Sequence, residues 1–326
     1  MPSDYGQLAK TGLFGTGRHR DHDVQHWLVA AGRERLRRPG RLHVIGASDA
    51  ATAQLITDLH DGVEGPVQTL SIASAEMVKL AANALLATKI TFINEIVTVC
   101  EATGADVEQV ATAIGMDHRL GPHFLKAGLG YGDSCFPKDS RALRPWQATP
   151  GTFQLLNSVI EVNDLQPRRA IQRLKTELGG LKGRRIALLG MTFKAGTDDL
   201  REAPSAVIAA RLLAESAEVH CWDPMARPAD VAPWNATVRH STPGEAMSDA
   251  DAAIVVTEWP ELKTVDWSAA GRSMRRRVLF DGRNVLDPNA MASAGFIYMS
   301  VGRATVLPMP SDASSRGGAG DGSPAL

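Results

Sequence analysis

Arg185-Ile186-Ala187-Leu188-Leu189-Gly190 is a short apolar run that ends in glycine, the pattern of a buried strand followed by a tight turn. A helix is expected after Pro204, and apolar runs of the same kind follow at residues 218–222, 252–256 and 277–281. Four strands that alternate with helical segments predict a parallel, Rossmann-like sheet over residues 184–304. The chain is therefore expected to be an α/β protein.

The turn after the first of these strands reads Gly190-Met191-Thr192-Phe193-Lys194, which does not match G-x-G-x-x-G. This difference disfavours dinucleotide binding in the usual manner. Ligands of open parallel sheets nevertheless lie beyond the carboxyl ends of the strands. Phe193, Lys194 and Arg201 are expected at that edge.

Upstream, the sequence predicts a helical middle region. Residues 71–101 form the longest run of apolar residues at helical spacing, and Lys79 and Asn83 lie four residues apart on one face of it. Such a pair can direct a cation and an amide at one oxygen, or simply hydrogen-bond at the surface. Further helices are expected at residues 106–114 and 153–178, the latter interrupted or only kinked by Pro167.

Between these helices stands Gly128-Leu129-Gly130-Tyr131-Gly132-Asp133-Ser134-Cys135-Phe136-Pro137-Lys138-Asp139. The glycines allow positive φ or a close approach to a ligand, and Pro137 restricts the backbone at the exit. A cation such as Lys138 near Cys135 lowers a thiol pKa and favours the nucleophilic thiolate. The alternative is that Cys135 is a small buried hydrophobic residue.

The composition excludes several function classes. A net charge of −1 over 326 residues gives no case for binding nucleic acid or an acidic membrane surface. The three cysteines, Cys100, Cys135 and Cys221, are widely spaced, so neither a disulfide framework nor a metal site is assigned. No unbroken transmembrane run and no signal-peptide pattern are evident, so a cytoplasmic location is expected.

The motifs together resemble the UDP-glucose/GDP-mannose dehydrogenase family, nearest to its branch that oxidises UDP-glucose. The blocks that carry the resemblance are the Cys135 loop, Ala75-Glu76-Met77-Val78-Lys79-Leu80-Ala81-Ala82-Asn83, Phe92-Ile93-Asn94-Glu95, residues 100–107, residues 114–117 and Gly190 to Ser205. Their order and number make the resemblance specific from about Gly40 to Arg303. It implies a helical dimerisation domain followed by a UDP-sugar-binding domain.

The resemblance also implies a mechanism. The family oxidises a sugar C6 alcohol to a carboxylate by two hydride transfers to NAD, which here would pass through a thioester on Cys135. Lys79, Asn83 and Asp139 would be the other catalytic residues. The implied UDP-sugar contacts are Arg119 (from a neighbouring subunit), Phe124, Leu125, Lys126, Gly132, Phe193 and Lys194, and the implied NAD contacts are Lys138 and Arg201. The product would supply uronate for polysaccharide biosynthesis.

Six ranges are expected along the chain. They are a flexible leader at 1–39, a remnant of an N-terminal NAD-binding domain at 40–70, a helical central domain at 71–165, a connecting helix at 166–183, the UDP-sugar-binding domain at 184–304 and a disordered tail at 305–326. The remnant should hold a strand at 42–46 and a helix from Ser48 to about His60, with its sheet partners missing.

Two departures from the family bear on activity. The family begins with a G-x-G-x-x-G domain that is not seen here, and Asp133 stands where the family has glycine, which should oppose ionisation of Cys135. We therefore expect this chain alone not to oxidise a sugar nucleotide. Three alternatives remain. The first is a dehydrogenase chain, truncated or begun at an internal start, whose missing domain lies on the same or a neighbouring gene. The others are a non-catalytic UDP-sugar-binding and dimerising module, and a remnant without binding function.

Overall fold

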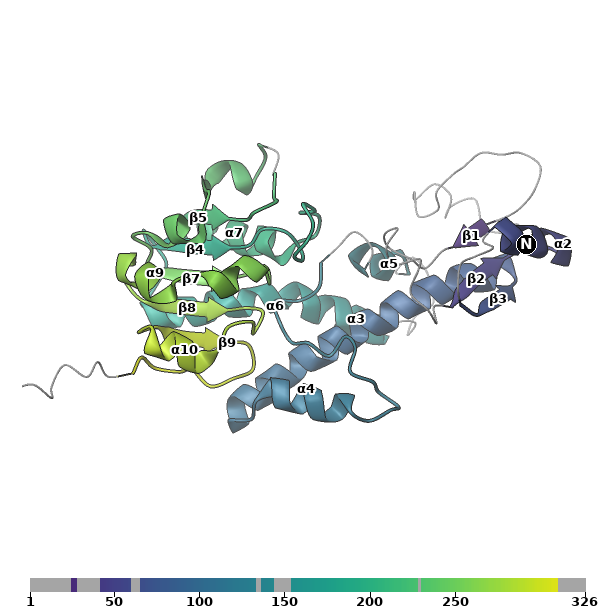
Figure 1. Cartoon of the computed structure of the whole chain (residues 1–326), viewed down its shortest axis with the longest axis horizontal. Coiled ribbons are helices and arrows are strands. Elements are labelled where there is room, and N and C mark those ends of the chain that lie inside the picture. The colour runs from purple at the N-terminus through teal and green to yellow at the C-terminus, as the bar shows by residue number, and fades with distance from the viewer. Residues whose placement is uncertain are drawn as a thin grey trace, which may run out of the picture. The chain divides into compact units, whose positions relative to one another are not determined.

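The computed structural model describes residues 25–27, 42–59, 65–132, 136–143, 154–227 and 230–309 (Figure 1). The chain packs into two compact units. The first comprises Met1–Phe92, His123–Leu125 and Tyr131–Asp164, and the second Ile93–Pro122, Lys126–Gly130 and Leu165–Leu326. These units follow packing and not chain order, so the sequence-derived domain ranges stay a prediction.

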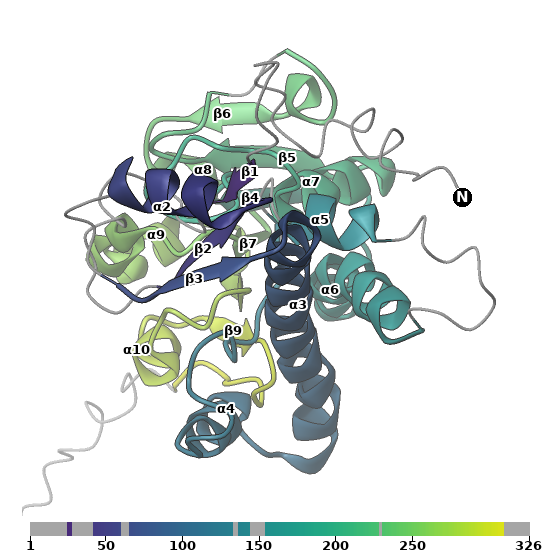
Figure 2. The ribbon, with the colours of Figure 1, turned by 90° about the vertical axis from the view of Figure 1, so that its right-hand side faces the viewer.

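The first unit contains a small sheet of order β1-β2-β3 (Figure 2). Strand β2 (His43–Gly46) pairs with β3 (Val67–Leu70) in parallel and with β1 (Gln25–Trp27) antiparallel. Helix α2 (Ala50–Leu59) covers one face of it by packing Ala53 and Ile56 on Ile45. The expected strand and helix are confirmed.

The expectation that this strand lacks sheet partners is wrong, because β2 is paired on both edges. The reason is that β3 has only four residues, two of them apolar, and is largely exposed, so it carries no strong strand signal. Strand β1 lies inside the expected flexible leader, and the rest of residues 1–39 falls outside the described residues. So does the expected tail beyond residue 309, whereas Val306 forms an antiparallel bridge with Tyr298.

Long helices occupy the predicted positions. Helix α3 (Ile72–Thr103) is continuous over 32 residues, and α6 (Gln154–Leu178) continues through Pro167. Helix α4 (Val107–Gly115) is capped at its N-terminus by Asp106, whose side chain accepts from the N–H of Glu108. By length and composition α3 could also cross a membrane, a property that the core helix of a globular protein shares.

The second unit contains a six-stranded parallel sheet of order β6-β5-β4-β7-β8-β9 (Figure 1). Its strands are β4 (Arg185–Leu189), β5 (Glu218–Trp222), β6 (Val238–His240), β7 (Ala252–Val255), β8 (Val278–Asp281) and β9 (Ile297–Ser300). The four predicted strands are confirmed. The sheet also contains two strands, β6 and β9, that were not predicted. Strand β6 has only three residues, two of them exposed, and β9 follows a helix of only six residues.

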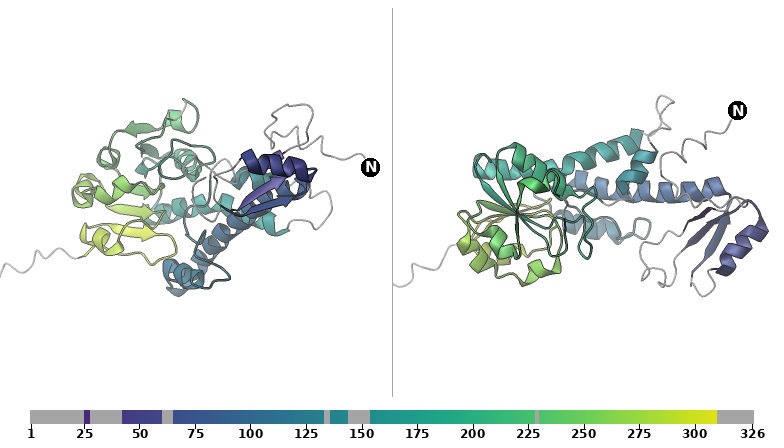
Figure 3. Two further views of the ribbon diagram at one scale, coloured as in Figure 1. Left: turned by 45° about the vertical axis from the view of Figure 1, so that its right-hand side comes forward. Right: turned by 90° about the horizontal axis from the view of Figure 1, so that it is seen from above.

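Helices cover both faces of this sheet (Figure 3). One face packs against α6, α7 (Pro204–Ala214) and the end of α3, and buries Ile186, Leu188 and Ile254. The other packs against α8 (Pro243–Met247), α9 (Trp267–Ser273) and α10 (Pro288–Ser293), and buries Ala187, Leu189 and Val255. The short helices η4 (Trp234–Ala236) and η5 (Pro260–Thr264) lie in the connections.

A histidine pair joins the edge strand β6 to β5. Nδ1 of His220 lies 2.8 Å from Nε2 of His240, with ring centroids 5.0 Å apart. Burial lowers the pKa of His220 below its ordinary value of 6.5, and Arg185 and His240 lower it further against the opposing effect of Glu218. Folding therefore favours the neutral ring.

We expect the free energy of unfolding to fall as the pH drops below about 6.5, because the unfolded state then binds the proton that folded His220 resists. Above that pH both states are neutral at this site and the effect vanishes. Urea unfolding of wild type and His220→Gln at pH 7.5 and 5.5 measures it. The wild-type midpoint should fall more than that of the variant, and equal falls would contradict the prediction.

Candidate active site

A buried carboxylate lies at the centre of the cluster of predicted catalytic residues in the first unit. Asp139, on helix α5 (Phe136–Ala142), is 1% exposed. Its Oδ2 accepts a hydrogen bond of 2.6 Å from Nδ2 of Asn83 and lies 3.6 Å from Nζ of Lys79. Lys79 and Asn83 are one turn apart on α3, so both reach the same oxygen. An ammonium, an amide and a carboxylate so placed can orient a water molecule or stabilise an oxyanion.

The predicted nucleophile lies just outside the described residues. Cys135 and Asp133 belong to residues 133–135, and α5 begins at the next residue, Phe136. The Phe136 ring makes edge contacts with Phe124 and Tyr131, at centroid distances of 6.1 and 6.0 Å. These aromatic contacts anchor the start of α5.

The predicted substrate loop has a constrained backbone around these rings. Phe124 has φ of 64°, a conformation that is unusual for an aromatic residue. Gly132 and Leu125 are buried, whereas Lys126 is exposed. Strain of this kind is typical of functional loops, where the surrounding structure enforces it.

Three side-chain amides hold this loop, and sequence analysis missed all three as site residues. In the second unit, Gly128 donates from its N–H to Oδ1 of Asn94 (2.9 Å) and accepts at its carbonyl from Nε2 of Gln166 (3.1 Å). In the first unit, Asn163 accepts from the N–H of Tyr131 (2.8 Å) and donates to its carbonyl (3.1 Å). Residues 128 and 131 lie outside the strands, and these side-chain amides supply the hydrogen-bond partners that a neighbouring strand would otherwise give to their backbone groups.

Two of the predicted UDP-sugar residues of the second unit, Phe193 and Lys194, lie in the loop after β4 together with the predicted NAD contact Arg201. Nζ of Lys194 is 5.1 Å from the centroid of the Phe193 ring, and Phe193 donates from its N–H to the carbonyl of Asp199. Arg201 forms a bidentate pair with Asp199, and the hydrogen bonds from Arg201 lower the pKa of that carboxyl. The structure thus brings Phe193, Lys194 and Arg201 into one loop.

Arg119 is likewise paired with an aspartate two residues before it, in the segment after α4. Its guanidinium and its backbone N–H donate to Asp117, and these bonds lower the pKa of the Asp117 carboxyl. Most of the Arg119 side chain is exposed, with 76% of its surface accessible. Lys138 is likewise exposed.

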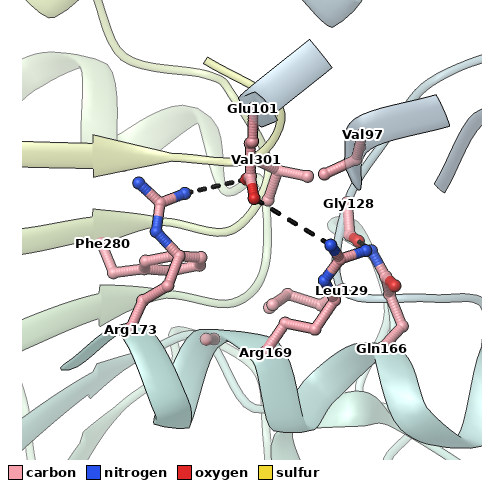
Figure 4. Close-up of a pocket in the computed structure, with 10 residues that line it drawn as sticks. Val97, Glu101, Gly128, Leu129, Gln166, Arg169, Arg173, Phe280 and Val301 are labelled. Carbon is pink, nitrogen blue, oxygen red and sulfur yellow. Dashed lines mark hydrogen bonds and ion pairs between the residues drawn. The ribbon is translucent and has the colours of Figure 1, made fainter. Parts of the chain in front are cut away.

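A pocket in the second unit is lined by Gly128 and Leu129 of the glycine-rich loop and by Gln166, but by none of the individually predicted catalytic, UDP-sugar or NAD contacts (Figure 4). Arg173 donates to Glu101 (3.0 Å) and to the carbonyl of Ser300, while Arg169 lies 4.0 Å from the same carboxylate. Glu101 also accepts from the N–H of Gly302. The charged groups therefore satisfy one another, and the pocket is a structural junction of α3, α6 and β9.

Comparison with known proteins assigns family descriptions to most of this architecture. Residues 73–165 match the central domain of the UDP-glucose/GDP-mannose dehydrogenase family, and residues 187–288 match its UDP binding domain.

Individual relatives agree with this result. The chain is 43% identical to UDP-glucose 6-dehydrogenase TuaD of Bacillus subtilis over 265 residues, which is 81% of this chain and 58% of the relative. It is 45% identical to UDP-glucose 6-dehydrogenase YwqF of the same organism, over 81% of this chain and 61% of the relative. The chain thus spans about three fifths of the length of these curated relatives.

A solved structure shows the same fold. The UDP-glucose dehydrogenase of Pyrobaculum islandicum superposes with a TM-score of 0.73 at 35% identity, covering 81% of this chain and 59% of that one. The NDP-N-acetyl-D-galactosaminuronic acid dehydrogenase of Methanosarcina mazei gives a TM-score of 0.74 at 26% identity, over 85% and 61%.

Proposed function

Since the chain belongs to the UDP-glucose/GDP-mannose dehydrogenase family, we propose that it binds a UDP-sugar and contributes Cys135 to an oxidation of the UDP-glucose 6-dehydrogenase type. The observation that carries the proposal is the cluster of Asn83 and Lys79 on one buried oxygen of Asp139. Asp139 lies one helical turn after Cys135 in the sequence. A nucleophile, an oxyanion-stabilising cation and a carboxylate that orients water would serve addition of the thiol to an aldehyde and hydrolysis of the thioester, and the hydride removed between these two steps would pass to NAD when it is bound.

The UDP-sugar is proposed to contact Phe193 and Lys194 in the second unit, and the loop residues Phe124, Leu125, Lys126 and Gly132, with Arg119 reaching it from a neighbouring subunit. Lys194 supplies a charge for the diphosphate, and Phe193 an apolar surface for the base or sugar. The Asp139 cluster would hold the reacting end of the sugar. A cytoplasmic location fits this chemistry and stays a prediction.

NAD, when bound, would accept hydride from the sugar. The described residues do not fit its pyrophosphate at the turn after β4, because the N–H groups of Met191 and Thr192 there already donate to Asp223. The steps proposed for this chain therefore do not pass through NAD. Lys138 and Arg201 stay proposed contacts for it. The closed turn favours a second candidate function, a UDP-sugar-binding and dimerising module that performs no oxidation.

Calorimetry with UDP-glucose tests the binding. Lys194→Ala should weaken binding by about tenfold or more, because a charge-assisted hydrogen bond contributes about 1.5–3 kcal/mol. The control is Lys182→Ala, an exposed lysine before the amino end of β4, which should bind as the wild type does. Absence of heat and of a thermal shift with wild type at millimolar UDP-glucose would exclude both candidate functions.

NADH absorbance then separates the two candidates. Wild type and Cys135→Ala are each supplied with NAD and UDP-glucose. Turnover that the alanine variant lacks establishes the dehydrogenase. Binding without turnover identifies the non-catalytic module.

A second copy of the chain is the proposed partner, and α3 is the proposed contact surface. Met77, Leu85, Phe92 and Val99 are 49–62% exposed, and their spacing places them within about 80° of the helix circumference. An exposed apolar stripe of this kind is typical of a helix that packs against a partner.

Light scattering after gel filtration tests this surface. Phe92→Glu should convert a dimer into a monomer, because a carboxylate buried in an apolar interface loses its hydration. The control is Val207→Glu, which places the same charge at an exposed valine on α7. An unchanged mass for Phe92→Glu, or a monomeric wild type, would contradict the prediction.

A further inference from the structure

The large sheet has a topological switch point between β4 and β7. The chain runs outward from β4 through β5 to β6, then returns to the other side of β4 and runs through β7 to β9. Ligands of such sheets bind in the crevice beyond the carboxyl ends of the strands at this point. In dinucleotide-binding sheets, the backbone N–H groups of the turn after the first strand hold phosphate there.

In this chain those N–H groups are already occupied by an anion of the protein itself. Oδ2 of Asp223, directly after β5, accepts from the N–H of Met191 (2.7 Å) and from the N–H of Thr192 (3.0 Å). The same oxygen accepts from Nε1 of Trp259 (3.0 Å), which follows β7. One carboxylate oxygen thus joins the ends of three neighbouring strands.

The other oxygen of Asp223 also accepts hydrogen bonds. Oδ1 accepts from the N–H groups of Met225 (2.9 Å) and Ala226 (2.8 Å), so five N–H groups converge on this one side chain. Successive backbone N–H groups around an anion form the kind of concavity that binds phosphate in other proteins. In this chain the concavity is occupied by the carboxylate of Asp223, a side chain of the protein itself.

The floor of the crevice is closed as well. The hydroxyl of Thr257, after β7, donates to the carbonyl of Thr192 at 2.6 Å. Gly190 donates from its N–H to the carbonyl of Trp222, and a Cβ at Gly190 would lie 2.4 Å from Cβ of Thr257. The turn thus packs directly against Thr257, and the chain continues from it to Phe193 and Lys194.

We propose that Asp223 is an internal anion that occupies the phosphate-binding turn of this sheet, excludes dinucleotide phosphates from it and fixes the Phe193-Lys194 loop for a UDP-sugar. Asp223 is on this account a positioning and specificity-determining residue. Its role at the turn stands on the hydrogen bonds alone. Its role toward the UDP-sugar rests on the proposed function.

Rescue by a small external anion tests the proposal. Asp223→Ala removes the carboxylate and leaves five converging N–H groups around a space of its size. Formate should therefore raise the melting temperature of this variant by several degrees, and leave the wild type unchanged at the same ionic strength set with sodium chloride. Asp223→Asn should be destabilised without rescue, because its amide fills the space and turns N–H groups toward N–H donors.

Asp251→Ala is the matched control. Asp251 is a buried carboxylate at the opposite ends of the same strands, directly before β7, and it accepts from the N–H of Arg185 and from Arg184. Because Arg184, Arg275 and the N–H of Arg185 surround its carboxylate, formate should raise the melting temperature of Asp251→Ala as well, and this variant serves as the control for UDP-glucose binding. Equal formate responses in Asp223→Ala and Asp223→Asn, or none in Asp223→Ala, would overturn the proposal. Should Asp223→Ala not stay folded, its refolding yield from urea with and without formate gives the same result.

UDP-glucose affinity gives the second readout. Asp223→Ala should weaken binding about tenfold, and formate should restore it, whereas Asp251→Ala should bind as the wild type does. If the wild type binds no UDP-glucose, the proposed function fails, while formate rescue still decides the role of Asp223 at the turn. If the wild type binds and Asp223→Ala binds equally well, the positioning role is refuted.

Discussion

Gly190→Ala is expected to destabilise the second unit by about 2–5 kcal/mol, a large fraction of the stability of a typical domain, which is about 5–15 kcal/mol. Two costs add at this position. Gly190 has φ of +98°, which disfavours any residue with a Cβ by about 1–2 kcal/mol. The added Cβ would also lie 2.5 Å from Oγ1 and 2.6 Å from the backbone N of Thr257, and crowding in a packed core costs about 1–3 kcal/mol.

Two other glycines separate these costs. Gly196 has φ of +77°, and a Cβ added there would meet nothing within 4 Å, so Gly196→Ala should show the conformational cost alone. Gly244, in α8, has neither a positive φ nor a neighbour within 4 Å, and alanine there should be neutral or stabilising by up to about 1 kcal/mol. Urea unfolding should rank the variants 244, 196 and 190 in order of increasing loss. Equal stability of Gly190→Ala and Gly196→Ala would show that the turn yields to the side chain.

Asp139→Asn should lower kcat/KM for UDP-glucose oxidation by about 100-fold or more, the usual contribution of a positioned acid or base. The variant keeps the size of the side chain but removes the negative charge that Lys79 and Asn83 face across 3.6 and 2.6 Å. An amide can neither accept a proton from water nor counter the ammonium of Lys79. The assay is NADH absorbance in the assembly that supports turnover.

The control is Asp58→Asn, an exposed aspartate on α2 of the same unit, which should leave kcat/KM unchanged. UDP-glucose affinity should change far less in Asp139→Asn than kcat does, because Asp139 acts on the reacting end of the sugar. A parallel loss of affinity and rate would assign Asp139 to substrate binding. An unchanged kcat/KM would remove it from the mechanism.

The sequence predicted elements with a strong repeating pattern. The apolar spacing over residues 71–101 yields α3 within two residues at either end, because burial along a long helix repeats every three to four residues. Strand β6 was not predicted, because three residues on a sheet edge, two of them exposed, show no repeating apolar pattern. Its pairing with β5 is a tertiary property that no local pattern encodes.

The candidate site was predictable to the extent that it resembles a family. Lys79, Asn83 and Asp139 could be named together only through that resemblance, since 56 residues separate Asn83 from Asp139. Asn163 and Asp223 could not be named at all. Their partners are backbone groups about thirty residues away, and a single amide or carboxylate has the same appearance in a sequence whether it binds solvent or a distant turn.

The interleaved packing of the chain has a practical consequence for recombinant fragments. Val97 and Val107, which precede the UDP-binding region by some eighty residues, share one core with Ile186, Ile208 and Val301. A fragment cut at the start of that region would display this apolar surface to solvent, and we expect it to aggregate when expressed. A fragment that begins at residue 93 keeps the surface covered. Autonomous folding here depends on a segment that a linear domain map assigns to its neighbour.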